Sequence, residues 1–171
     1  KAQGTPTSNQ KFTFSCWVKL GVTGTNRAIF NVGPNSSEQW DTGIFIDSSD
    51  NIRGIWDNRG AGYIIKTTAT YRDPTAWYHI VLAIDSTQAA AGNRSKLYVN
   101  GTQVTVLTTE LAPDQNTTNS AIASGNTIAV GRTTVGTTNY FDGYLAEVVF
   151  IDGTQYAASD FGEFDEDSPT I

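Results

Sequence analysis

The sequence predicts a single all-β domain, an antiparallel jelly-roll β-sandwich with almost no helix. Its 171 residues are enough for one two-layer core. The 24 threonines favour strands, whereas the 16 glycines and 12 asparagines favour the turns between strands. Short apolar segments recur at regular spacing between turn signals and give about ten to twelve strands, which indicates a sandwich or barrel and not a parallel α/β fold.

The first half of the chain predicts a flexible arm followed by short strands. Residues 1–10 are mostly polar and small, and we expect them to form the arm. Strict alternation of apolar and polar residues predicts the first strand over residues 11–20. Further strands are predicted at 27–32, 42–47, 51–57 and 63–71, and residues 48–50 suit a hairpin turn between two of them.

The second half adds a strand at residues 77–85, a hairpin and two closing strands. Asn100-Gly101 lies between alternating runs, which is the signature of a type I′ hairpin turn. After a long polar stretch, strands are predicted at 127–132 and 141–153. Residues 154–164 alone suggest helix, of about one to two turns, with Ser159 and Asp160 as possible caps.

The last of these strands is apolar on both faces, with Glu147 as the lone acid among its apolar residues. A strand with one face in water should alternate apolar with polar residues. We therefore expect it to be covered on both sides, inside a curved sandwich and paired near the first strand. The side chains expected to face the core are Tyr144, Val148 and Phe150, and those expected under covering loops are Leu145, Val149 and Ile151.

Negative charge gathers at the C-terminus. The chain has 11 basic and 17 acidic residues, a net charge of −6. The clustered acids are Asp160, Glu163, Asp165, Glu166 and Asp167. We therefore predict a domain over residues 11–164 and a solvated acidic tail or linker over 165–171. Apart from these five acids the chain is nearly neutral, so we expect no basic surface that would bind nucleic acid. No apolar stretch approaches the roughly 20 residues of a membrane-spanning helix.

Four segments together resemble laminin-G-like domains of the concanavalin A-like lectin/glucanase superfamily. They are "FTFSCWVKL", "WYHIVLAIDSTQ", "NRSKLYVNGTQV" and "FDGYLAEVVFIDGTQYAASDFGEF", which occur in the family's order and span residues 11–164. The ending "FDGYLAEVVFIDGTQYAASDFGEFDED" further resembles modules in structural and tail proteins of tailed bacteriophages, especially marine ones. The resemblance implies a jelly roll of about twelve to fourteen strands that serves recognition or assembly.

The residues that could carry catalysis are sparse, and we expect no enzyme. Cys16 is the single cysteine, so it can form no intramolecular disulfide, and it is expected as a small buried hydrophobe. His79 is the single histidine, in the middle of an apolar strand, and no nucleophile elbow is present. Glycosidases of this superfamily need paired carboxylates, and the one near match, Glu163 to Asp167, lies in the acidic tail.

Loops rich in aromatic and polar residues are the candidate carbohydrate sites. Aromatic faces stack on sugars, while Asp, Asn and Arg side chains hydrogen-bond to hydroxyl groups. The candidates are Trp40 and Asp41 in one loop, Trp56, Asp57, Asn58, Arg59 and Tyr63 around a glycine-rich turn, and Tyr140 in a third loop. The alternative is that Trp56 and Tyr63 fill the core and that residues 57–60 form an ordinary turn.

Calcium is a possible cofactor by resemblance, with weak support in the sequence. Asp47 and Asp50 lie in "DSSDN" and offer carboxylate oxygens, but that segment equally suits the hairpin turn. Asp85 ends a strand and is a second candidate ligand, with capping of the following loop as the alternative. The spacing of an EF-hand is absent.

The resulting hypothesis is a non-catalytic recognition module of a phage tail fibre or appendage, located on the virion surface and binding host-surface carbohydrate. The alternative is a structural or decoration module that contacts neighbouring virion proteins, and the third is a glucanase-type hydrolase. The sequence begins with lysine and contains no methionine, so we expect a fragment or a processed chain. Any homo-oligomer is expected to form through regions outside it, because no heptad pattern is present.

Overall fold

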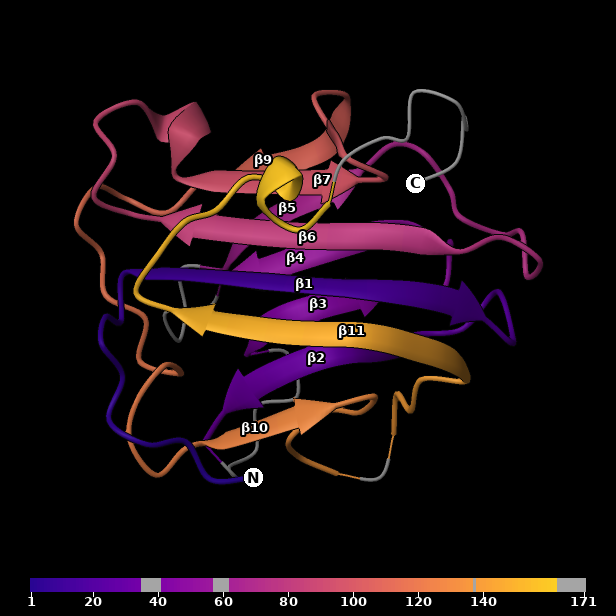
Figure 1. Ribbon diagram of the computed structural model, residues 1–171, viewed down its shortest axis with the longest axis horizontal. Coiled ribbons are helices and arrows are strands. Elements are labelled where there is room, and N and C mark those ends of the chain that lie inside the picture. The colour runs from indigo at the N-terminus through magenta and orange to yellow at the C-terminus, as the bar shows by residue number, and fades with distance from the viewer. Residues whose placement is uncertain (35–40, 57–61, 137, 163–171) are drawn as a thin grey trace.

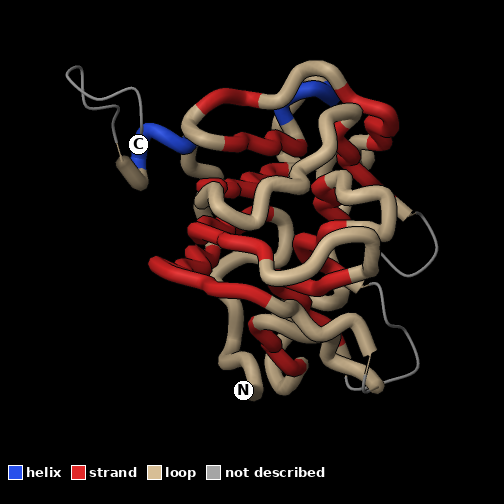
Figure 2. The backbone as a smooth tube through the Cα atoms, turned by 90° about the vertical axis from the view of Figure 1, so that its right-hand side faces the viewer, coloured by secondary structure: helices blue, strands red, loops and turns tan. Residues whose placement is uncertain are grey.

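The computed structural model describes residues 1–34, 41–56, 62–136 and 138–162. These residues form two antiparallel sheets that pack face to face, with two single-turn 3₁₀ helices, η1 (Ala91–Asn93) and η2 (Ala158–Asp160) (Figure 1). Figure 2 shows the molecule from the side, with the strands of the two layers next to each other. The predicted all-β sandwich is confirmed.

The sheet nearest the viewer in Figure 1, here called the front sheet, has the strand order β11-β1-β6-β7-β8. Its strands are β1 (Lys11–Leu20), β6 (Tyr78–Asp85), β7 (Ser95–Val99), β8 (Thr102–Gln103) and β11 (Gly143–Asp152). The back sheet has the order β10-β2-β3-β4-β5-β9. Its strands are β2 (Arg27–Gly33), β3 (Thr42–Ile46), β4 (Ile52–Trp56), β5 (Tyr63–Thr67), β9 (Leu107–Leu111) and β10 (Thr127–Val130).

Local turn signals predicted the hairpins correctly. Asn100 and Gly101 have φ values of +48° and +74°, as a type I′ turn requires at both central positions. The turn after β3 likewise joins two antiparallel neighbours of the back sheet. The sequence predicts one strand after Asn100-Gly101, whereas the structure has two, β8 and β9. Between them the chain passes from the front sheet to the back sheet, where β9 pairs with β5.

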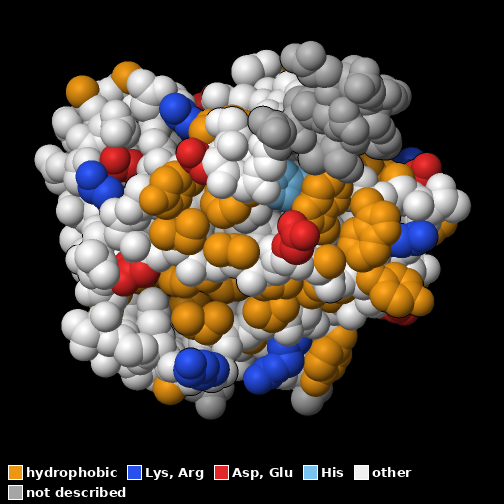
Figure 3. Space-filling model, in the orientation of Figure 1, with side chains coloured by type: hydrophobic (Ala, Val, Ile, Leu, Met, Phe, Trp, Pro, Cys, Tyr) orange, Lys and Arg blue, Asp and Glu red, His pale blue; other side chains and the backbone are white. Residues whose placement is uncertain are grey.

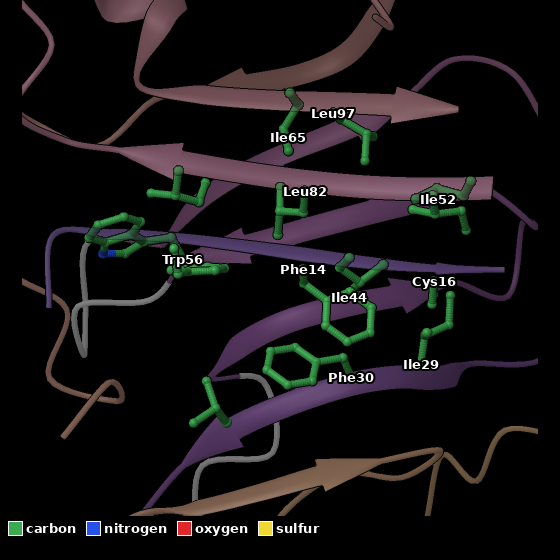
Figure 4. Packing of buried hydrophobic residues seen from close by; sticks show 14 of the residues in the cluster. Phe14, Cys16, Ile29, Phe30, Ile44, Ile52, Trp56, Ile65, Leu82 and Leu97 are labelled. Atoms are coloured by element: carbon green, nitrogen blue, oxygen red, sulfur yellow. The ribbon is translucent and has the colours of Figure 1, made fainter. Parts of the chain in front are cut away.

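The core lies between the two sheets and is rich in aromatic and branched side chains (Figure 4). Phe14 of β1 stacks on Phe30 of β2 with ring centroids 4.3 Å apart, which joins the two layers. Cys16 is fully buried beside them, and burial raises the pKa of its thiol well above the ordinary value. The prediction of a small buried hydrophobe at this position is confirmed.

Residues 1–10, for which the sequence predicts a flexible arm, lie against the body. Ala2 bridges to Thr127, and the backbone N–H of Gln3 donates to a carbonyl beside β10. The amide of Ser8 donates to the carboxylate of Asp152 at the end of β11, 3.2 Å away. Backbone groups of the arm thus complete the edge of the back sheet and the end of β11. This pairing depends on long-range contacts that composition cannot reveal.

The closing strand β11 pairs with β1 as predicted, but it is an edge strand, and a bulge changes which of its residues face the core. The register shifts between Ser15 and Trp17 of β1, where the partner in β11 changes from Val149 to Ala146. Glu147 lies in this bulge with φ +49°. A bulge adds one residue to one strand, so the in–out alternation reverses across it.

The predicted faces of β11 are therefore partly wrong. Leu145 and Phe150 both pack on the core, although alternation places them on opposite faces. Tyr144 and Val148, predicted to face the core, are exposed. Val149 lies away from the core as expected, but it too is exposed rather than roofed by a loop. A left-handed residue that is not glycine leaves no mark in the sequence, which is why the reversal was missed.

The chain after β11 crosses the outer face of the front sheet, as the yellow segment of Figure 1 shows. Ala158 in η2 packs against Val81 of β6 and Tyr98 of β7. The carboxylate of Asp160 accepts a hydrogen bond from the amide of Ala157 at 2.8 Å, so one predicted cap is present. This segment covers β6 and β7, whereas β11 stays uncovered. The predicted acidic tail, residues 165–171, lies outside the described residues.

Candidate functional site

The outer face of the front sheet carries exposed apolar side chains around β11 (Figure 3). Trp77 is 41% exposed and Tyr144 is 67% exposed. Val149 and Tyr156 are also exposed, and Ala146 lies between Tyr144 and Val149 along β11. We call these five residues, together with Trp17, the front patch. Contiguous apolar surface of this kind marks an interaction site in soluble proteins.

A groove of about 280 Å³ lies within the front patch, lined by Trp17, Trp77, Ala146 and Glu147. Trp17 points outward because its neighbours on β1, Cys16 and Val18, point into the core. Ala146 is directly opposite Trp17 in the register of β1 and β11, and its small side chain leaves the indole face open. Trp77 directly precedes β6 and forms the second aromatic wall.

Among the described residues that line this groove, Glu147 is the one with a charged side chain. It is exposed, and its carboxylate makes no hydrogen bond or ion pair to any other residue that the structure describes. Its left-handed backbone costs of the order of 1 kcal/mol for a residue with a side chain. An unpaired carboxylate held there by a strained bulge is available to accept hydrogen bonds from a ligand.

His79 of β6 is opposite Trp17 in the register of β1 and β6, on the same outer face of the front sheet, and its ring packs on the indole. The imidazole is buried, and its ring centroid lies 5.0 Å from that of Trp17 at an interplanar angle of 32°. Its Nε2 shares a hydrogen bond of 2.8 Å with the hydroxyl of Ser15. Burial lowers the pKa of His79 more than the charge of Glu147 raises it, so the ring is neutral at pH 7. The sequence predicts a structural histidine here, and the hydrogen bond and ring packing agree with that prediction.

The residues predicted from the sequence do not line this groove. Trp56 is 2% exposed and packs on Phe12 with ring centroids 5.9 Å apart, and Tyr63 is also buried, with its hydroxyl donating to Asp114 at 3.2 Å. Both are corrected to core residues, because β4 and β5 turn them toward the front sheet. The alternative interpretation of these two residues was right.

The other candidates are scattered or undescribed. Asp41 is fully buried beside Gly33, where an added Cβ would collide with its carboxylate, so it is not open to a ligand. Tyr140 is exposed on the loop before β11 but does not line the groove. Trp40, Asp57, Asn58 and Arg59 lie outside the described residues.

Asp50, a candidate calcium ligand, belongs to a buried ion pair. Its Oδ1 lies 2.6 Å from Nη2 of Arg27, and its Oδ2 accepts from Nε of Arg72 at 2.9 Å. Burial favours a higher pKa for Asp50, but the hydrogen bonds from the Gly24 amide and the two arginines outweigh it and lower the pKa. The carboxylate joins the start of β2 to the turn after β3.

The other two candidate calcium ligands are also engaged within the protein. Asp47 lies 2.7 Å from Nζ of Lys66 and accepts backbone N–H groups of the hairpin turn. Asp85 lies 3.3 Å from Nζ of Lys11 and accepts from Thr87 in the next loop. Both carboxylates therefore act in the alternative roles, as turn and loop caps. Across the described ranges, no group of three or more His, Cys, Asp or Glu is placed to hold a metal ion.

The sequence contained partial signals for the groove that were not used. Trp17 is out of phase with the core residues of its strand, so alternation alone places it outside. Glu147 is the lone acid among apolar residues in the last strand. No local signal relates either residue to Trp77, since strand pairing across the sheet brings them together.

Comparison with known proteins gives a family and a fold. A laminin G-like family model, described as the concanavalin A-like lectin/glucanases superfamily, matches residues 1–158. No curated protein sequence matches the chain. Neither helical turn in the described part of the chain is long or apolar enough to cross a membrane.

Several solved structures are similar in fold at low sequence identity. The CBM40 domain of the Ruminococcus gnavus IT-sialidase, bound to α2,6-sialyllactose, has 14% identity and a TM-score of 0.64, with 94% of this chain and 93% of that chain covered. A leech intramolecular trans-sialidase has 17% identity and a TM-score of 0.62, with 90% of this chain and 23% of that chain covered. A Limulus polyphemus pentraxin has 17% identity and a TM-score of 0.55, covering 86% and 66%.

Proposed function

We propose that this chain, which belongs to the concanavalin A-like lectin/glucanases superfamily, is a non-catalytic carbohydrate-binding module whose ligand occupies the groove of the front patch. The observation that carries the proposal is the pairing of two tryptophan walls, Trp17 and Trp77, with an unpaired carboxylate, Glu147, around a small floor residue. Apolar walls with a few directed polar groups are the usual composition of a small-molecule site.

The groove suits the amphipathic surface of a sugar. The C–H face of a pyranose packs on an indole ring, while its hydroxyl groups donate to a carboxylate, and hydrogen bonds to a charged acceptor are the stronger kind. The volume of about 280 Å³ lies just below the range of about 300–1,000 Å³ that is typical for small ligands. A site this small and open favours one terminal sugar residue and weak affinity for each site.

The similar structures support carbohydrate as the ligand class. The Ruminococcus gnavus CBM40 domain is a carbohydrate-binding module, and its structures contain sialyllactose. At identities of 16% and 14%, this similarity does not identify which sugar the chain binds. The absence of catalysis is part of the proposal, since the described residues that line the groove include one carboxylate, whereas glycosidases use two, about 5–9.5 Å apart.

We further propose that the module lies on the virion surface of a tailed bacteriophage, in a tail fibre or appendage, and binds host-surface glycan. The support for this setting is the resemblance of residues 141–167 to modules of such proteins. Direct contact with a neighbouring virion protein is the second candidate function. The front patch favours it, because Tyr144 and Val149 extend the apolar surface beyond the groove.

Binding of the domain to surface polysaccharide from candidate hosts, with and without calcium, tests the proposal. We expect saturable binding that is independent of calcium, because Asp47, Asp50 and Asp85 are engaged within the protein. Trp77→Ala is expected to weaken it about tenfold or more, a loss of about 1.4 kcal/mol. Tyr140→Ala is the matched control, since it removes an exposed aromatic ring outside the groove.

Two outcomes would contradict the proposal. Equal loss from Trp77→Ala and Tyr140→Ala would mean that the groove is not the site. No binding to any polysaccharide by the folded domain would favour the second candidate function, which predicts that Tyr144→Asp prevents assembly with a virion partner.

A further inference from the structure

We infer that the groove selects neutral sugars and rejects acidic ones, including the sialic acids carried by ligands of similar folds. The inference rests on the proposed function and narrows its ligand class. It follows from the arrangement of charge around Trp17, Trp77 and Glu147.

Glu147 dominates the charge of the groove. It is exposed and unpaired among the described residues, and it lies within reach of any ligand that packs on the two indoles. His79 beside Trp17 adds no positive charge at pH 7, because burial lowers its pKa. Among the described residues that line the groove, a ligand therefore meets one formal negative charge and no cation.

Lys19 lies on the same face of β1 as Trp17 but is not part of the groove lining. It is opposite Tyr144 in the register, two residues beyond Trp17. A cation outside the lining acts on a bound ligand more weakly than Glu147 within it, because the interaction between charges falls with distance.

Three of the described arginines, which are the side chains best suited to grip a carboxylate, are engaged elsewhere. A carboxylated sugar is best held by a guanidinium group, which offers two parallel N–H donors. Arg27 and Arg72 both contact Asp50, and Arg94 donates to three backbone carbonyl groups. None of these three lines the groove.

A neutral sugar, in contrast, matches the free carboxylate. Two neighbouring hydroxyl groups can donate to the two oxygens of Glu147, while the ring packs on an indole. A second carboxylate at the same distance is repelled, and the repulsion is stronger in a partly desolvated groove than in bulk water. Similarity of fold to a sialyllactose-binding domain therefore does not extend to an acidic ligand.

Matched pairs of neutral and acidic sugars test the inference on the intact domain. The pairs are glucose with glucuronic acid, galactose with galacturonic acid, and lactose with α2,3-sialyllactose, titrated at pH 7 and low salt while the tryptophan indole N–H resonances are followed. We expect the neutral member of the binding pair to have a Kd at least tenfold lower. The preference should shrink as salt is added, because salt screens exposed charges.

Two substitutions separate charge from fold. Glu147→Gln keeps the shape and removes the charge, and it should reduce the preference to about threefold or less by weakening neutral binding and easing acidic binding. Glu110→Gln removes an equal exposed charge from β9 in the back sheet, and it should leave the preference unchanged. Glu147→Gly provides a second neutral variant in case Gln destabilises the bulge.

Each result has a distinct meaning. Equal or tighter binding of the acidic member by the unaltered domain overturns the inference and leaves the carbohydrate proposal standing. An unchanged preference in both Glu147 variants overturns it as well. If no sugar of any pair shifts the indole resonances, the proposed function fails, and the inference fails with it.

Discussion

Substitution of Glu147 by glycine or by valine separates the backbone role of this residue from the role of its charge. The residue has φ +49°, in the left-handed region that disfavours residues with a Cβ atom. Glycine has no Cβ atom, so the substitution removes the cost of about 1–2 kcal/mol that the left-handed conformation imposes on the folded state. Glycine also has more conformational freedom in the unfolded chain, and this freedom offsets about 0.5–1 kcal/mol of the stabilisation. Glu147→Gly is therefore expected to leave the free energy of unfolding unchanged or to raise it by about 1 kcal/mol.

Valine has the opposite effect, because a β-branched side chain tolerates positive φ poorly. Glu147→Val should be less stable than Glu147→Gly by about 2 kcal/mol. A change of 1 kcal/mol shifts the Tm of a domain of about 150–250 residues by about 2–4 °C, so the two variants should differ by several degrees. Urea unfolding followed by circular dichroism gives the free energies, and thermal scans give the Tm values.

Both variants lack the carboxylate, so both should bind neutral sugars more weakly whatever their stability. A glycine variant that is as stable as the unaltered domain but binds neutral sugars more weakly would show that glutamate is retained at a strained position for its charge. Equal stability of the glycine and valine variants would refute the reasoning, because it would mean that the bulge does not hold this residue in the left-handed conformation.

Other predictions concern the packing beneath the site. Asp50→Ala should lower the free energy of unfolding by about 3–5 kcal/mol, since it leaves the Arg27 charge buried without its partner. Hydrogen bonds outweigh burial and lower the pKa of Asp50 below 3.8. Its contribution to the free energy of unfolding is therefore present above about pH 4 and is lost as the pH falls through the pKa of the folded state. Asp50→Asn should not show this acid-dependent loss of stability. Gly43→Ala should destabilise by several kcal/mol, because the new Cβ would collide with the Phe30 carbonyl oxygen. Cys16 should resist thiol reagents in the native domain and react in urea.

Local patterns predicted the elements that depend on local chemistry. The ten residues of β1 agree with the predicted strand because apolar residues recur at every second position throughout its length. The prediction of a turn at Asn100-Gly101 was correct, because a turn with positive φ at two consecutive residues favours that dipeptide. The pairing of Lys1 and Ala2 was not predicted, because their backbone groups find partners more than a hundred residues away in the chain.

The candidate site depended on information that the sequence holds weakly. Trp56 lies on the same face of β4 as Ile52, and both side chains are buried. The alternation along β4 therefore predicts the burial of Trp56 better than the polar turn that follows it in the sequence. The groove joins Trp17, Trp77 and Glu147 from three distant segments. Only the pairing of β1 with its two neighbours in the front sheet makes them adjacent.

The two apolar faces of β11 now have separate explanations. One face packs on the core through Leu145 and Phe150, as sandwich strands do. The other face carries Tyr144, Ala146 and Val149 and is left open, because the segment with η2 covers β6 and β7 instead. Exposed apolar side chains on an edge strand are a liability unless a ligand or partner covers them.

The bulge at Glu147 admits two explanations that experiment can separate. Bulges and charges on an edge strand prevent pairing with other chains, so the bulge and its carboxylate have a role even without a ligand. If that is their whole purpose, Glu147→Gln should increase self-association and leave sugar binding intact. If the bulge serves to present the carboxylate to a ligand, Glu147→Gln should weaken binding of neutral sugars while the domain stays monomeric. Sedimentation velocity and sugar titration on the same sample distinguish the two, and a variant that both aggregates and fails to bind would show that one residue performs both tasks.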